Sequence, residues 1–349
     1  MTIISLQDVS IIFGKQPDDA LALADDGATR EEIQAATGMI LGVHNCSLNI
    51  REGEIVVLMG LSGSGKSTLL RAINGLNPIA RGRVLVRDGD SVIDVGRTGK
   101  NAICHLRMHL VSMVFQQFGL LPWRTVEENV AFGLELSGMP KEKRLAIARE
   151  QLELVGLQQW AGHRISSLSG GMQQRVGLAR AFATGAPILL MDEPFSALDP
   201  LIRARLQDEL LALQASLQKT IVFVSHDLDE AMKLGNRIAI MQGGRIVQCG
   251  TPQDILLRPS NQYVADFVAH MNPLNVLRAG DIMTPLDRSA PPRPFAATAR
   301  PETYVRDLMQ AVAATSGDVG IVDNGTIIGK IAADDIIRAL AWHQSRHSL

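Results

Sequence analysis

The sequence predicts an α/β protein in which a largely parallel sheet is interrupted by a helical subdomain and followed by a small α+β unit. Short apolar runs bounded by turn residues alternate along the chain with segments of helical period, which is typical of this fold class. A glycine-rich loop lies directly between a strand-like run and a helix-like run. A proline-rich stretch, RSAPPRPF at 288–295, separates the last segment from the rest. A chain of 349 residues has room for two or three domains of roughly 150 residues each.

The composition excludes several classes of protein. The net charge of −2 argues against nucleic-acid or acidic-membrane binding as the main task. Cys46, Cys104 and Cys249 lie far apart and form no CxxC pair or Cys/His cluster, which favours reduced structural thiols in a cytosolic protein. No run approaches the roughly 20 apolar residues of a membrane span, and MTIISLQDVS lacks the basic and apolar regions of a signal peptide. Work at a membrane would therefore require a partner.

Residues 1–270 are expected to form the first domain. Continuous apolar runs predict buried strands at 54–59, 187–193 and 220–227. A helix is expected at 66–75, directly after the glycine-rich loop. The segment RIAIMQGGRIVQCG at 237–250 has the alternating pattern and the central Gly-Gly of a hairpin.

Two segments interrupt this pattern of strands. Helical period dominates between about 120 and 184, as in KEKRLAIAREQLELVGL, so a helical subdomain is expected there. Residues 15–41 form an insertion rich in Asp and Ala. Within it, TREE at 29–32 fits a capping box, which predicts a short surface helix.

Residues 271–349 are expected to form a linker and a second domain. After the proline-rich stretch, TYVRDLMQAVA has helical period, VGIVD and TIIGKIA read as strands around Asn324-Gly325, and DDIIRALAWH reads as a final helix. This compact β/α pattern predicts a small α+β domain.

The glycine-rich loop matches the phosphate-loop pattern GxxxxGK[ST], which predicts a nucleotide site. Glycines let backbone N–H groups wrap the phosphates, and the following helix directs its positive end at them. In this pattern the lysine reaches the β- and γ-phosphates, and the serine hydroxyl can ligate Mg²⁺. The candidate binding residues are Gly60, Leu61, Ser62, Gly63, Ser64, Gly65, Lys66, Ser67 and Thr68.

Two acidic residues supply what such a site still needs. Asp192 follows the apolar run ILLM and would hold the Mg²⁺ shell, while Glu193 would polarise the attacking water as general base. His226 follows another strand and is expected to contact the γ-phosphate. Gln116, in SMVFQQF, is a candidate amide ligand to Mg²⁺ or to the water. As isolated features an acidic strand end, a single histidine and a single glutamine also fit ordinary structural roles.

Six motifs taken together resemble the ATP-binding-cassette (ABC) ATPases over roughly residues 1–270. They are the phosphate loop at 60–68, VFQ at 114–116, LSGGMQQRV at 168–176, ILLMDEP at 188–194, SALD at 196–199 and SHD at 225–227. The resemblance implies the cassette fold, ATP with Mg²⁺, and a Q-loop role for Gln116 that couples the site to a transmembrane partner. It implies a switch role for His226 and adenine stacking for Phe13, although many relatives have Tyr there.

LSGGMQQRV looks like a phosphate loop without its lysine, and the resemblance explains this. In the family, two subunits pack head to tail, and each ATP lies between one subunit's phosphate loop and the other's signature. The implied signature residues are Ser169, Gly170, Gly171 and Gln173, and Asp199 takes the D-loop role. A homodimer, rather than a monomer, is therefore the expected catalytic unit.

Several longer stretches resemble the ATPases of quaternary-amine importers, including FGLLPWRTVEENVAFGLEL and the extra segment at 15–41. The resemblance implies uptake of choline, glycine betaine, proline betaine or trimethylamine N-oxide, and AHMNPLNVL at 269–277 looks most like the choline type. It implies a membrane permease, a periplasmic substrate-binding protein, and a peripheral location on the cytoplasmic face of the bacterial inner membrane. Residues 278–341 resemble a single cystathionine-β-synthase-type (CBS) repeat, which implies a regulatory domain that pairs across the ATPase dimer or packs on its own subunit.

Other functions of a cassette ATPase fit this sequence less well than import. DNA-repair and chromosome-structure ATPases place long coiled coils between the phosphate loop and the acidic strand end, but no heptads lie between Lys66 and Asp192. Soluble translation and resistance factors carry two cassettes, whereas this chain has one set of motifs. A non-enzymatic sensor has no need of Glu193 as a base. An exporter, or an importer of another substrate class, stays open as an alternative.

Overall fold

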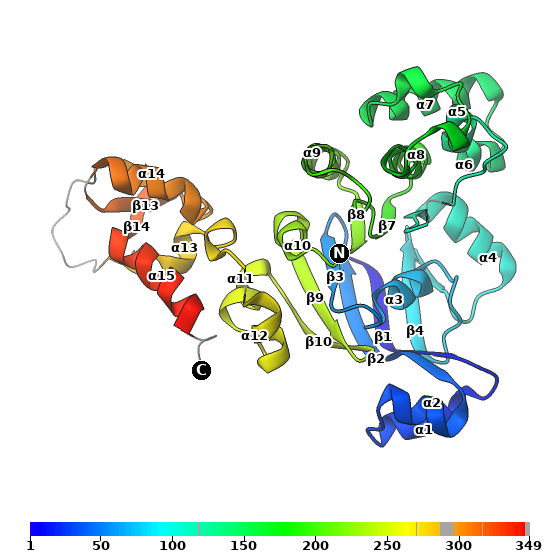
Figure 1. Ribbon diagram of the computed structural model, residues 1–349, viewed down its shortest axis with the longest axis horizontal. Coiled ribbons are helices and arrows are strands. Elements are labelled where there is room, and N and C mark those ends of the chain that lie inside the picture. Colours follow the sequence, from blue (N-terminus) through cyan, green and yellow to red (C-terminus); the bar gives the residue numbers. More distant parts are fainter. Residues whose placement is uncertain (118, 270, 287–294, 296, 316, 346–349) are drawn as a thin grey trace. The chain divides into compact units, whose positions relative to one another are not determined.

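The computed structural model describes residues 1–117, 119–269, 271–286, 295, 297–315 and 317–345. The chain divides into two compact units. The first consists of Met1–Asp227 with Leu234–Val247, and the second of Leu228–Lys233 with Gln248–Leu349. The nucleotide motifs lie in the first unit (Figure 1).

A six-stranded sheet forms the centre of the first unit, in the order β10-β9-β3-β8-β7-β6. From β9 to β6 each pair of neighbours is parallel. All residues of β3, β7 and β8 are buried, as expected for strands covered on both faces. The strands are β3 (Ile55–Met59), β6 (Val111–Val114), β7 (Ile188–Asp192), β8 (Thr220–Val224), β9 (Arg237–Gln242) and β10 (Arg245–Gly250). The strands and the hairpin expected from the apolar runs are confirmed.

A second sheet in this unit is antiparallel, in the order β2-β1-β4-β5, and the sequence patterns did not predict it. Its strands are β1 (Thr2–Phe13), β2 (Ile40–Arg51), β4 (Arg81–Asp88) and β5 (Ser91–Asp94). Phe13 pairs with Ile40, so the chain leaves and re-enters the sheet at neighbouring positions. The residues between them form an excursion at the end of this sheet.

That excursion contains two helices, α1 (Pro17–Asp25) and α2 (Arg30–Thr37), rather than the single short helix expected. The predicted capping box is present, because Thr29 accepts from Glu32 N while Glu32 accepts from Thr29 N. Ile33 is fully buried in a cluster formed with α1 and the adjoining ends of β1 and β2. The insertion is therefore anchored in an apolar core of its own, whereas the sequence predicted only a short surface helix.

A polar link joins α1 to both neighbouring strands. The Asp25 carboxylate accepts two hydrogen bonds from Arg81 of β4, at 2.6 and 2.7 Å. Its Oδ1 also lies 2.9 Å from Nε2 of His44 on β2. The Arg81 guanidinium holds the pKa of Asp25 well below its ordinary value, with a smaller lowering by His44. Burial lowers the pKa of His44.

Asp25→Asn is expected to make the stability of this unit less dependent on pH. A carboxylate with a depressed folded-state pKa stabilises above its unfolded pKa of about 4, and that contribution is lost as the pH falls toward the folded value. Urea unfolding at pH 7, 5 and 3.5 should therefore show a gap between wild type and variant that narrows below about pH 4. Asp90→Asn, at an exposed turn, is the control. A gap of constant size at all three pH values would contradict the ion pair.

The remaining helices of the first unit include the expected helical subdomain, whose helices lie together in Figure 1. Its helices are α5 (Val126–Val130), α6 (Phe132–Leu136), α7 (Lys141–Leu154) and α8 (Gly170–Ala183), with 3₁₀ turns at Gln158–Trp160 and Ile165–Ser167. The others are α3 (Lys66–Ile73), α4 (Lys100–His105), a π-helical turn at Leu106–Leu110 and α9 (Pro200–Leu217). Across the described ranges, no helix combines the length and the apolar character needed to cross a bilayer.

The second unit contains a four-stranded sheet in the order β11-β14-β13-β12. The hairpin β13–β14 turns at Asn324 and Gly325, both with positive φ, as predicted for an Asn-Gly turn. The elements are α10 (Leu228–Leu234), α11 (Pro252–Leu257), α12 (Gln262–Val268), a 3₁₀ turn at Pro273–Asn275, α13 (Ala279–Ile282), β11 (Thr284–Pro285), β12 (Ala297–Ala299), α14 (Val305–Thr315), β13 (Val319–Asp323), β14 (Thr326–Ile331) and α15 (Ala333–Ser345). Apart from Phe295, the expected proline-rich linker lies outside the described residues.

Candidate active site

The phosphate loop connects β3 to α3, as the motif requires. Gly60, Gly63 and Gly65 all have positive φ, a conformation that side chains with a Cβ disfavour. A Cβ on Gly60 would collide with the carbonyl of Met241, and one on Gly65 would lie 2.6 Å from the carbonyl of Gly42. The loop therefore packs against neighbouring backbone at Gly60 and Gly65, where a larger residue does not fit, whereas at Gly63 only the positive φ favours glycine.

Two groups of the loop point to an anionic ligand. Lys66 is buried, and its Nζ donates to the carbonyls of Gly60 at 2.8 Å and Leu61 at 3.0 Å. Burial lowers the pKa of Lys66, opposed by the negative charges of Glu193 and Asp192. Ser64 Oγ is buried and has no hydrogen-bond partner among the described residues. A buried ammonium and an unpartnered hydroxyl at a helix N-terminus fit a phosphate group.

Ser67 and Arg71, on α3, form a polar cluster with Asp192 at the end of β7. Ser67 Oγ donates to Asp192 Oδ1 at 2.6 Å, and Arg71 Nη2 lies 2.9 Å from Asp192 Oδ2. Asp192 has no exposed surface, so these two partners satisfy a carboxylate that would otherwise be costly to bury. The predicted pair of Ser67 and Asp192 is thus brought together across 125 residues of sequence.

Glu193 faces the pocket from a left-handed backbone conformation, with φ of 50°. Its Oε2 accepts a 3.3 Å hydrogen bond from Gln116 Nε2 and lies 3.2 Å from His226 Nδ1. The carboxyl group is therefore held by two neighbours from different strand ends. Positive φ in a residue other than glycine is a local strain that clusters at functional sites.

One open pocket of about 890 Å³ lies at the phosphate loop, with Lys66, Ser67 and Glu193 in its lining. Its lining includes ten of the residues predicted from the sequence: Phe13, Ser62, Gly63, Gly65, Lys66, Ser67, Thr68, Gln116, Glu193 and His226. Phe13 is 39% exposed, and its ring lies against Gly42, where a Cβ would come within 3.0 Å of it. A pocket of this size is typical of small-ligand sites.

The signature residues do not line this pocket in the described part of the chain. Ser169 caps α8 by accepting from Met172 N at 3.4 Å, and Asp199 caps α9 by accepting from Ile202 N at 3.0 Å. Gly170 and Gly171 form the first turn of α8. The Gln173 side chain, on α8, donates to the carbonyls of Ile165 and Leu168 in the segment before this helix. The structure therefore does not bring the signature to the nucleotide pocket of the same chain.

Sequence reasoning missed several residues that organise the site. Gln174, almost fully buried, donates to the carbonyl of Glu193 at 3.2 Å and accepts from Ala197 N at 3.1 Å, so it ties α8 to the catalytic segment. Arg71, noted above, neutralises Asp192. The pocket is also lined by three residues of α2: Arg30, Glu31 and Gln34. In the sequence only the capping box indicates this helix, and a capping box does not predict a contact between the helix and the pocket.

The donor set around Ser67 fits Mg²⁺ bound together with phosphate. Mg²⁺ usually keeps several waters and takes one or two protein oxygens plus substrate phosphates. Among the described residues no cluster of three or more His, Cys, Asp or Glu side chains could form an all-protein metal cage. One hydroxyl and one carboxylate oxygen 2.6 Å apart match the shared arrangement instead.

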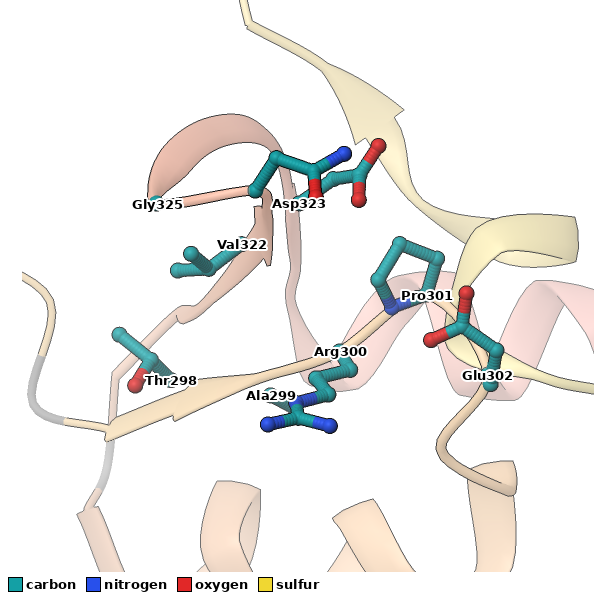
Figure 2. Close-up of a pocket in the computed structure, with 9 residues that line it drawn as sticks. Thr298, Ala299, Arg300, Pro301, Glu302, Val322, Asp323 and Gly325 are labelled. Carbon is teal, nitrogen blue, oxygen red and sulfur yellow. The ribbon is translucent and has the colours of Figure 1, made fainter.

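The second unit has a pocket of about 740 Å³ between the β13–β14 turn and the segment that follows β12 (Figure 2). Arg300 and Glu302 lie on that segment, and Asp323 lies at the turn. The lining carries both signs of charge but none of the nucleotide motifs. The nucleotide motifs thus belong to the first unit alone.

Comparisons with known proteins agree with the geometry of the site. Residues 43–196 match the family model described as ABC transporter. The glycine betaine transport ATP-binding protein OpuAA of Bacillus subtilis (strain 168) is 50% identical over 280 residues, which cover 80% of this chain and 66%, just under two thirds, of that protein. The trimethylamine N-oxide transport system ATP-binding protein TmoW of Ruegeria pomeroyi is 43% identical over 342 residues, covering 97% of this chain and 98% of that protein.

A solved structure extends the comparison to the fold. The dimeric ATP-binding cassette MJ0796, in a post-hydrolysis state bound to ADP and phosphate, matches with a TM-score of 0.62 and 32% identity, over 72% of this chain and 99% of that chain. The phosphate loop and the buried carboxylate beside its serine are the parts with which P-loop ATPases hold phosphate and Mg²⁺. The chain belongs to the ABC transporter ATPases, in the branch that contains the ATP-binding proteins of glycine betaine and trimethylamine N-oxide transport systems.

Proposed function

We propose that this ATPase powers the import of a small quaternary amine or related osmolyte through a transmembrane permease. The candidate substrates are choline, glycine betaine, proline betaine and trimethylamine N-oxide. The observation that carries the proposal is the match to TmoW, a trimethylamine N-oxide transport ATP-binding protein, along almost the whole of both chains. The choline type expected from 269–277 stays a prediction within this class.

The chemistry follows from the pocket. Lys66 and the backbone N–H groups of the loop would hold the β- and γ-phosphates, with Phe13 against the adenine. Mg²⁺, held by Ser67 and Asp192, would neutralise phosphate charge when bound. Glu193 would accept a proton from the attacking water at a carboxylate oxygen. Its contacts with Gln116 and His226 keep that carboxylate oriented toward the pocket.

The catalytic unit in this proposal is a homodimer. Ser169 and the first turn of α8 lie outside the pocket of their own chain, so they are free to face a nucleotide held by a second copy. Each charge-assisted hydrogen bond to the γ-phosphate is worth roughly 1.5–3 kcal/mol. Hydrolysis would remove these bonds and release the dimer, which couples chemistry to movement.

The proposal includes the partners and location expected from the sequence. The ATPase would sit on the cytoplasmic face of the inner membrane, bound to a permease that receives substrate from a periplasmic binding protein. Residues 271–349 would form a regulatory domain resembling a single CBS-type repeat.

Transport can be tested with the ATPase reconstituted in vesicles together with a permease and a substrate-binding protein of a quaternary-amine import system. We expect ATP hydrolysis to rise several-fold when the binding protein is loaded with one of the four candidate osmolytes. Loading with an unrelated sugar or amino acid is the control. If only the sugar or the amino acid raised ATP hydrolysis, the ATPase would belong to another substrate class. Stimulation by DNA or ribosomes, without a permease, would overturn the import function.

A further inference from the structure

The insertion that precedes β2 reaches the phosphate loop through one side chain. The Arg30 guanidinium donates to the carbonyl of Gly63, inside the phosphate loop, through Nη1, and to the carbonyl of Gly42, on β2, through Nη2. It thereby links the phosphate loop to β2. Both acceptors are backbone atoms, so the contact does not depend on any other side chain.

The surrounding backbone leaves room for this guanidinium. A Cβ placed on Gly244, in the β9–β10 turn, would lie 2.6 Å from Arg30 Nη2, and one on Gly65 would lie 3.3 Å from the same atom. The turn itself is bound to the loop, since Gly244 N donates to Ser64 O at 3.1 Å. Three glycine-bearing segments thus form a niche that the Arg30 side chain fills.

The helix that carries Arg30 is held in one orientation. The capping box fixes its first turn, and Ile33 is buried in the core shared with α1. Gln34 follows Arg30 by one helical turn and lines the same pocket, as neighbours at this spacing should. A rigid helix can therefore hold a cation at a defined place on the pocket wall.

The Arg30 side chain brings a positive charge to the wall of the pocket. Arg30 Nε is buried and makes no hydrogen bond in the described part of the chain. Burial lowers the pKa of Arg30, so the charge is held at a cost in solvation that nearby phosphates would offset. Arg30 and Lys66 contribute positive charges to the lining of this pocket, and Glu31 and Glu193 contribute negative ones.

We propose that Arg30 is a positioning residue of the nucleotide site, and that the insertion at 15–41 is therefore part of the ATP-binding machinery. Arg30 holds the phosphate loop against β2 in the shape that receives the phosphates, and it places a second positive charge on the wall beside them. The inference extends the ATPase activity and does not depend on which osmolyte is imported.

The test uses the full chain with MgADP as the binding probe and MgATP for turnover. Arg30→Ala is expected to raise the Kd for MgADP about tenfold, because the variant loses both the link between the phosphate loop and β2 and a positive charge on the pocket wall. A larger effect is not expected, since the Arg30 side chain is only partly buried. The KM for ATP should rise by a similar factor, with a smaller change in kcat. Arg30→Lys keeps the charge but loses the planar fork, so its Kd should fall between the two.

The matched control is Arg97→Ala, which removes one positive charge at an exposed position that does not line the pocket. Its Kd should equal that of the wild type. Thermal unfolding without nucleotide reports on the fold. If Arg30→Ala binds MgADP as tightly as the wild type, or only lowers Tm without changing Kd or KM, the proposal is wrong. If the alanine variant does not fold, an unchanged Kd in Arg30→Lys overturns it in the same way. Failure of the wild type to bind MgADP would instead refute the nucleotide site itself.

Discussion

Replacing Glu193 by glutamine is expected to lower kcat for ATP hydrolysis by about 10²- to 10⁴-fold while ATP binding is retained. Glutamine has the same shape, so it can keep the left-handed backbone and the neighbouring contacts of Glu193. It cannot accept a proton from water. Because ATP would bind without being hydrolysed, the variant should accumulate as a nucleotide-dependent dimer.

Steady-state phosphate release and sedimentation with and without ATP would measure the two effects. Glu150→Gln, an exposed residue of α7, is the matched control and should leave both unchanged. Undiminished turnover in Glu193→Gln would show that Glu193 is not the general base. Lost nucleotide binding would show that it holds the ligand rather than the water.

Replacing Ser169 by arginine is expected to abolish hydrolysis while a single subunit still binds ATP. The structure places Ser169 at the N-cap of α8 and outside the pocket of its own chain. The change removes a cap worth roughly 1 kcal/mol and puts a long side chain where a partner's nucleotide should fit. Turnover and MgADP titration would measure the two effects. Ser91→Arg, on β5 of the antiparallel sheet, is the control for the added charge.

Mixing two inactive variants would test the shared site directly. A dimer of one Lys66→Ala chain and one Ser169→Arg chain contains one site with both defects and one site with none. Part of the wild-type activity should therefore return on mixing. If each chain used its own signature, every site in the mixture would stay defective, and no activity would return.

The order of elements in the first unit could be predicted from sequence because its central strands are continuous apolar runs. Strands buried on both faces show this signal wherever they occur. The antiparallel sheet was missed because β4 and β5 are partly exposed, with few buried residues in β4 and none in β5. The helix α1 was missed because its buried residues are two alanines and a leucine, a weak apolar signal in an acidic segment.

The sequence by itself determined the chemistry of this protein. The phosphate loop, Asp192, Glu193 and the signature are each recognisable as short contiguous motifs, because their roles depend on local backbone shape and residue type. Only the tertiary structure decided which residues support them. Arg30 reaches Gly63, Gln174 reaches Glu193, and Arg71 reaches Asp192 through contacts between distant elements. Such contacts depend on how helices dock through their buried residues, as Ile33 docks α2, and no local pattern encodes them.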